Sequence, residues 1–80
     1  MYKVKIQTYI KKNGKYVLDN TDYMRVTFPK EVPFEEIVKS YSEAIYQTFK
    51  AFYFPNEVEV KDNCIRYGEI VQKLSKEETK

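Results

Sequence analysis

The chain contains no histidine and no tryptophan, and its only cysteine is Cys64. Without histidine, the usual proton shuttle and the commonest metal ligand are both missing. A structural zinc site needs several histidine or cysteine ligands, and a nucleophilic cysteine needs a nearby base. We therefore expect no catalytic residue, no bound metal and no cofactor, and we predict that the protein is not an enzyme.

Long uncharged segments are also missing. Stretches such as 51–56 are far shorter than the ~20 apolar residues that span a bilayer, so no contact with a membrane is expected. The N-terminus lacks the apolar core of a signal peptide, and a single cysteine forms no internal disulfide. These features predict a cytoplasmic protein.

Tyrosine, phenylalanine and lysine are abundant instead. There are eight Tyr and five Phe in 80 residues, and Lys outnumbers Arg by twelve to two. Residue types with AT-rich codons (Phe, Tyr, Met, Ile, Asn and Lys) number 37, whereas Gly, Ala, Arg and Pro together number nine. This composition and the short length favour a phage or mobile element with an AT-rich genome, and hence a bacterial or phage-infected host cell.

Charge is unevenly distributed along the chain. The net charge is only +2, but residues 1–30 carry seven cations against two Asp, a balance of +5. Residues 31–80 carry seven cations against ten carboxylates, a balance of −3. The N-terminal part is therefore predicted to present a basic surface that would steer an acidic partner.

Alternating apolar and polar residues over 2–11 predict a half-buried first strand. Asn13-Gly14 follows, and this dipeptide is the strongest signal of a two-residue type I′ turn. The turn fixes the pairing of the hairpin, because it places Ile10 opposite Val17.

The returning strand, predicted over 15–28, does not keep a single register. Its apolar residues reach the core face only if a bulge or a second tight turn lies within 19–22. Such a shift would place Met24 opposite Val4 and Val26 opposite Tyr2.

A long amphipathic helix is predicted over 33–53. Pro33 suits the first helical turn, and Pro55 disfavours helical geometry just before it. About twenty residues rise ~30 Å, so we expect the helix to cover the first hairpin end to end, with Ile45 central to its buried face. The apolar arc consists of Phe34, Ile37, Val38, Tyr41, Ala44, Ile45, Thr48, Phe49 and Phe52.

A second hairpin is predicted over 57–61 and 64–68, joined by Asp62-Asn63. In this register Val58 faces Tyr67, Val60 faces Ile65, and Glu59 faces Arg66 as an opposite-charge pair. Residues 69–78 fit either a short C-terminal helix or a strand, and 75–80 are expected to form a frayed charged tail. The predicted fold is α+β: a single ββαββ domain whose two hairpins form one antiparallel sheet, with the helix on one face.

Two surfaces hold more tyrosine and lysine than a core requires. The outer face of the first hairpin combines aromatic rings with cations that would contact a partner, although it reads equally as an ordinary solvated face. Its members are Lys3, Lys5, Tyr9, Lys11 and Tyr16. A second strip follows one side of the helix, where the tyrosines would alternatively cap the rim of the core. It consists of Lys39, Tyr46, Lys50 and Tyr53.

Three functions fit this pattern. The first is a non-enzymatic protein-binding module, most readily a short phage or mobile-element protein that inhibits a host protein such as a defence nuclease. The second is a small nucleic-acid-binding protein that uses the Tyr9 and Lys face. The third is a structural homo-oligomer, such as a homodimer formed through an open sheet face or edge. The partner, the strand order and the oligomeric state do not follow from the sequence.

Overall fold

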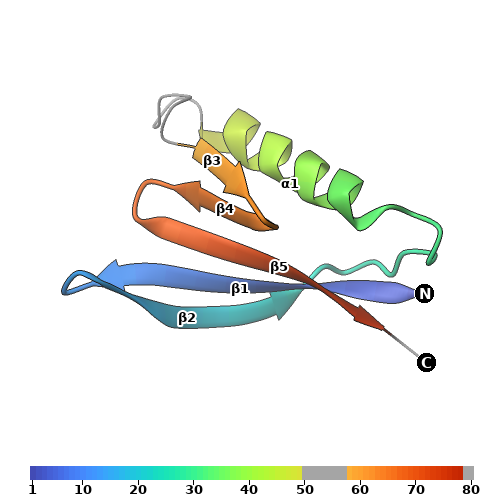
Figure 1. Ribbon diagram of the computed structural model, residues 1–80, viewed down its shortest axis with the longest axis horizontal. Helices are drawn as coiled ribbons and strands as arrows, with labels where there is room; N and C mark the ends of the chain where they lie inside the picture. Colours follow the sequence, from blue (N-terminus) through green and yellow to red (C-terminus); the bar gives the residue numbers. More distant parts are fainter. Residues whose placement is uncertain (50–57, 79–80) are drawn as a thin grey trace.

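One helix and five strands make up the computed structural model, which describes residues 1–49 and 58–78 (Figure 1). The fold class is α+β, as predicted, with one helix against a five-stranded antiparallel sheet. The chain order is ββαβββ, one strand more than expected. The elements are β1 (Tyr2–Lys12), β2 (Lys15–Tyr23), α1 (Phe34–Phe49), β3 (Val58–Lys61), β4 (Cys64–Tyr67) and β5 (Ile70–Glu78).

The last strand lies at the centre of the sheet, whose order is β2-β1-β5-β4-β3. β5 pairs with β1 from Tyr2–Glu78 to Ile10–Ile70, and its other edge pairs with β4. The short helix considered for 69–78 is therefore not formed, and the expected fraying at 75–80 is wrong for 75–78. Pairing with Tyr2 to Lys5 of β1 gives residues 75–78 backbone partners that an isolated tail would lack.

The first hairpin has the predicted turn and register. Asn13 and Gly14 both have positive φ, at 51° and 79°, as a type I′ turn requires. Ile10 pairs with Val17 and Lys12 with Lys15. The register shifts opposite Thr8 and Tyr9, so that Asp19 is the extra residue of a bulge inside the predicted 19–22 window.

β2 ends earlier than the predicted residue 28. The Met24 N–H donates to the Val4 carbonyl at 2.9 Å, which confirms that pairing. Tyr2, however, bridges to Phe28 and not to Val26, and Val26 is 57% exposed. A second irregularity at 25–26 thus lets the larger aromatic ring reach the core, because the ring removes more apolar surface from water than valine would.

α1 buries a slightly different face from the predicted one. Ile45 is only 7% exposed, as expected for the centre of the buried face. Ala44 and Thr48 of the predicted arc are exposed, whereas Ser42 is buried and its hydroxyl donates to the Lys39 carbonyl at 2.7 Å. The helix is thus rotated towards Ser42, which is small enough to approach the sheet closely. The predicted continuation over 50–53 lies outside the described residues.

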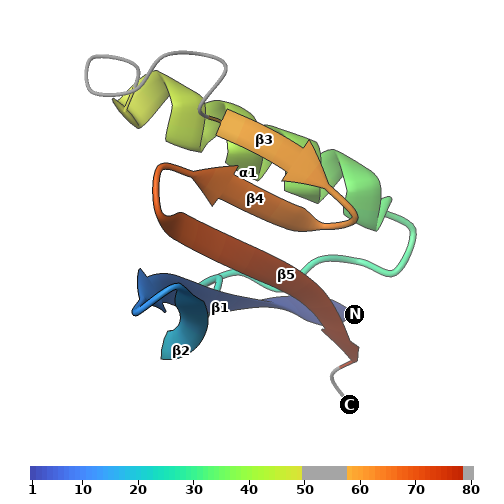
Figure 2. The same cartoon turned by 60° about the vertical axis from the view of Figure 1, so that its left-hand side comes forward.

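The helix does not cover the first hairpin end to end. In Figures 1 and 2, α1 runs beside β3 and β4, and β2 lies at the opposite margin of the sheet. All nine residues of β2 are exposed. The expectation failed because β5 inserts between the hairpins and moves β2 away from the helix. The core consists of Tyr2, Val4, Ile37, Val38, Ile45, Ile65, Tyr67 and Leu74.

Tyr2 anchors one end of this core. Its side chain is fully buried, and its hydroxyl donates to the Val32 carbonyl at 2.7 Å. The ring contacts Phe28 and Phe34 at centroid distances of 5.7 and 6.4 Å, and the Lys76 Nζ lies 4.7 Å from its centroid. Burial, followed by the nearby Glu35 carboxylate, raises the pKa of this phenol.

Candidate interaction surface

The face of the sheet opposite α1 has no covering layer within the described part of the chain, and we call it the outer face. Alternation along each strand sends every second side chain there, and the strand pairing aligns them in rows. The outer face comprises Lys3, Lys5, Gln7, Tyr9, Lys11, Tyr16, Leu18, Thr21, Tyr23, Glu59, Lys61, Cys64, Arg66, Val71, Lys73, Ser75 and Glu77.

An apolar row crosses the middle of the outer face. Leu18 of β2 pairs with Tyr9 of β1, and Tyr9 pairs with Val71 of β5. Leu18 is 47% exposed, while Tyr9 and Val71 are half-buried by their neighbours. These three side chains form a contiguous patch, because directly paired residues have Cβ atoms only ~4.5–5.5 Å apart.

The same row ends in the predicted ion pair. Val71 pairs with Arg66, and Arg66 Nη2 donates to Glu59 Oε2 at 2.6 Å. This hydrogen bond, and then the charge of Arg66, lowers the pKa of Glu59, and the same two causes in the same order raise the pKa of Arg66. Both side chains are about half exposed, so the pair orients the guanidinium more than it stabilises the fold.

A second carboxylate lies at the other end of the outer face. Glu77 pairs directly with Lys3, and its Oε2 accepts a hydrogen bond from the Tyr23 hydroxyl at 3.2 Å. That hydrogen bond is the main cause of a raised pKa of Tyr23. Because Glu77 faces Lys3, the end of the outer face nearest the N-terminus is less basic than the sequence of β1 alone implies.

The residues predicted on the first hairpin are brought together on the outer face. Lys3 and Lys11 are exposed, Lys5 and Tyr9 are half-buried, and Tyr16 is 46% exposed. Tyr16 pairs with Lys11, as the Asn13-Gly14 turn predicted. The structure thus groups these five side chains, although it does not test their role.

The predicted helical strip is separate from this group. Lys39 and Tyr46 belong to α1, on the other side of the sheet. Tyr46 is half-buried and lines a cavity between α1 and β3 together with Ser42 and Val58. Lys50 and Tyr53 lie outside the described residues.

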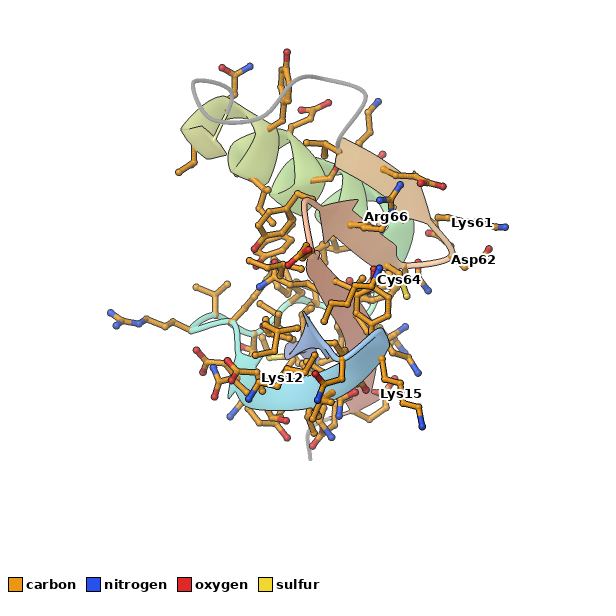
Figure 3. The ribbon with its side chains drawn as sticks, turned by 90° about the vertical axis from the view of Figure 1, so that its left-hand side faces the viewer. Lys12, Lys15, Lys61, Asp62, Cys64 and Arg66 are labelled. Atoms are coloured by element: carbon orange, nitrogen blue, oxygen red, sulfur yellow. The ribbon has the colours of Figure 1, made fainter. Side chains whose placement is uncertain are left out.

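Several members of the outer face were not identified from the sequence. Lys61 and Lys73 reach it from β3 and β5, on either side of Arg66, which the sequence had already placed opposite Glu59. Figure 3 shows Arg66, Cys64 and Lys61 close together on one side of the ribbon. For Lys73, the signal in the sequence was the alternation of side chains over 70–74, in which Ile70 and Leu74 share one face. Val71 interrupts this pattern, because it places an apolar residue on the opposite face.

Half-buried Cys64 lines a shallow hollow of the outer face with Lys61, Arg66 and Val71. Within residues 1–49 and 58–78, no group of three or more acidic or cysteine side chains is placed to hold a metal ion. Over the same residues, no helix has the length and apolar content needed to cross a membrane. Comparisons with protein-family models, curated proteins and solved structures found no match to this chain.

Proposed function

We propose that this chain is a non-enzymatic protein-binding module that docks an acidic surface of another protein on its outer face. The observation that carries the proposal is a concentration of positive charge. The outer face holds six cations and two carboxylates, a balance of +4, although the whole chain carries only +2. Charge segregated in this way steers an oppositely charged partner to one face.

The apolar row favours a protein over a nucleic acid. Leu18 and Val71 are aliphatic, and they flank Tyr9 at the centre of the charged face. An apolar centre with a charged rim and a central tyrosine is the usual anatomy of a protein–protein interface. The carboxylates of Glu59 and Glu77 on the same face would repel phosphates.

A host protein is the class of partner that the composition favours. The high share of residues with AT-rich codons supports a phage or mobile-element origin. A product of this kind that lacks histidine acts most simply by occupying a site on a bacterial protein. We would therefore test whether the chain inhibits a host protein by covering an acidic or nucleic-acid-mimicking surface. A regulatory face of a defence nuclease is one such surface.

A small nucleic-acid-binding protein is the second candidate, and one observation favours it. Tyr9, Tyr16 and Tyr23 all lie on the outer face, with Lys11 and Lys5 paired directly to Tyr16 and Tyr23. Aromatic rings next to cations on an open sheet stack bases and neutralise phosphates.

Affinity capture with matched variants tests the proposal. Immobilised chain would be exposed to a lysate of an AT-rich bacterium, alongside Tyr9→Ala and the triple change Lys3→Ala, Lys5→Ala, Lys11→Ala. We expect one host protein to be retained equally by the wild-type chain and by Lys39→Ala, the control variant on the helix. Tyr9→Ala should fail to retain that protein. A retained protein that ignores the outer-face changes would refute docking there.

An oligonucleotide titration separates the second candidate from the first. At about 150 mM salt, mixed single-stranded and duplex oligonucleotides should bind only weakly. Sub-micromolar binding would overturn the protein-binding proposal. In that case the triple lysine change should reduce the slope of log K against log salt by roughly two to three units, and Tyr9→Ala should cost ~1–3 kcal/mol.

A further inference from the structure

β2 lies at one edge of the sheet, and within residues 1–49 and 58–78 no strand pairs with its free side. A free edge pairs readily with another strand, and natural edges are often kept short or are blunted by proline, charged side chains or bulges. β2 has nine residues and no proline. Its central residue, Asp19, is charged and forms the bulge, but Tyr16, Val17 and Leu18 just before it are each close to half exposed, at 46%, 46% and 47%. The opposite edge, β3, has only four described residues.

The hydrogen bonds of the first hairpin show which backbone groups of β2 are free for a partner. Pairs in an antiparallel ladder alternately exchange and do not exchange hydrogen bonds. Met24 is bonded to Val4, so Tyr23 and Thr21 direct their N–H and C=O groups away from β1. On the other side of the bulge, the two-residue turn is closed at Lys15, and the same alternation turns Tyr16 and Leu18 to the free edge.

The side chain of Asp22 lies at this edge. Its Oδ1 accepts the Tyr23 N–H at 2.8 Å, which is one of the donors directed away from β1. The last donor of the edge is therefore satisfied within the chain. The carboxylate that satisfies it is positioned where a neighbouring strand would arrive.

We propose that β2 pairs antiparallel with β2 of a second copy of this chain, across a twofold axis, with Lys15 of each copy opposite Asp22 of the other. The bulge at Asp19 reverses the alternation of side chains. Lys15 and Val17 therefore share the α1 side of the sheet with Asn20 and Asp22, as their partners on β1 show. The register with Lys15 opposite Asp22 keeps the pairs Lys15–Asp22, Tyr16–Thr21 and Val17–Asn20 each on a common face. The backbone groups of Tyr16 and Thr21 both point outward, and Leu18 lies opposite the bulged Asp19 at the twofold axis.

The registers shifted by one residue, or by two residues towards Val17 opposite Asp22, fit less well. A shift of one residue puts side chains from opposite faces of the sheet into each pair. A shift of two residues keeps the faces, but it sets Val17 against Asp22 and requires the Tyr23 N–H that Asp22 already occupies. The proposed register instead forms two opposite-charge pairs, one on each side of the twofold axis.

This inference does not depend on the proposed function, because it uses the edge of the sheet and not its outer face. The dimer would contain one continuous ten-stranded sheet, since each copy contributes five strands. The outer faces of both copies would lie on the same side of that sheet, because an axis perpendicular to the sheet preserves the faces.

A charge exchange tests the pairing. Sedimentation equilibrium over a concentration range of about 5 to 500 μM would give the dimer dissociation constant of wild type, Lys15→Asp and Asp22→Lys. Each single change replaces two attractive pairs by two repulsive ones, so we expect dissociation constants at least about tenfold higher. An equimolar mixture of the two variants restores both attractive pairs and should return to the wild-type value. Lys30→Asp, which makes the same charge change in an exposed loop, should behave as wild type.

Three outcomes would overturn the proposal. The first is a wild-type chain that stays monomeric throughout this range. The second is a dimer that both single variants leave unchanged, and the third is a mixture of the variants that remains monomeric. Hydrogen exchange supplies a second measurement, because the Thr21 amide should become protected as the concentration of wild type rises. Far-UV circular dichroism of each variant would confirm that it is folded.

Discussion

Truncation of Leu74 tests the central position of β5 directly. Leu74 is 2% exposed and lies among the core side chains of α1, β1 and β4. Leu74→Ala removes about three buried carbon groups at ~0.8 kcal/mol each, a transfer loss of ~2.4 kcal/mol. The cavity that remains raises the typical cost to ~2.7–5 kcal/mol.

This cost is large for a chain of 80 residues. At ~0.05–0.15 kcal/mol per residue, the expected free energy of unfolding is only ~4–12 kcal/mol. Leu74→Ala should therefore remove a large part of the stability, and the chain would be partly unfolded if it lies at the low end of that range. Urea unfolding followed by far-UV circular dichroism gives the free energy and the m-value.

Val71→Ala is the informative control. In a strand, Val71 and Leu74 point to opposite faces, and Val71 is half-buried on the outer face, so its truncation should cost ~1 kcal/mol or less. In a helix, both residues would share one buried face and both truncations would be costly. Equal losses for the two variants, or a loss below ~1 kcal/mol for Leu74→Ala, would refute the placement of β5.

Three further predictions follow from single side chains. Ile45→Ala should cost ~2–5 kcal/mol in urea unfolding, whereas Glu43→Ala on the exposed side of α1 should change stability by no more than ~0.5 kcal/mol; a loss under ~1 kcal/mol for Ile45→Ala would mean that the phase of the helix is wrong. Arg66→Ala should raise the pKa of Glu59 towards its ordinary value of 4.5 in a carboxyl NMR titration, and an unchanged pKa would contradict the pairing. Because the folded-state pKa of Glu59 is lowered, the ion pair stabilises the fold above pH 4.5, and this contribution is lost as pH falls through the folded pKa. Burial raises the pKa of Tyr41, so the neutral phenol stabilises the fold below pH 10.0, and this contribution is lost as pH rises through the folded pKa. Tyr41→Phe should therefore lose less stability between about pH 9 and pH 12, and an identical alkaline slope would disprove it.

Local signals were sufficient for the hairpins. Asn13-Gly14 and Asp62-Asn63 both adopt positive φ at each central residue, and these turns fixed every predicted cross-strand pair next to them. The bulge followed from the conflict between a fixed turn and the need to bury Met24. In each case the information is contained in a few consecutive residues, where steric limits on φ leave few alternatives.

Strand order depends on contacts between distant residues, and it could not be read locally. Ile70, Val71 and Leu74 fit helical spacing as well as a strand, and only the free edges of β1 and β4 decide between the two. The missing strand order also explains why the outer face was predicted only in part. Alternation along β1 predicted Lys5 and Tyr9, but Lys73 became their neighbour only through the insertion of β5.

The central position of β5 also sets the order in which the molecule assembles. The pairing of Tyr2 with Glu78 joins residues 76 positions apart, so much of the ladder consists of contacts that close long loops. Chains dominated by such non-local pairings fold in milliseconds to seconds, far more slowly than helical domains of similar size. During synthesis the two hairpins are made before residues 70–78, and until those residues emerge β1 and β4 each present an unsatisfied edge. Because an isolated two-stranded hairpin is only marginally stable, the sheet becomes stable only once β5 has joined the two hairpins, and the chain is exposed to aggregation until then.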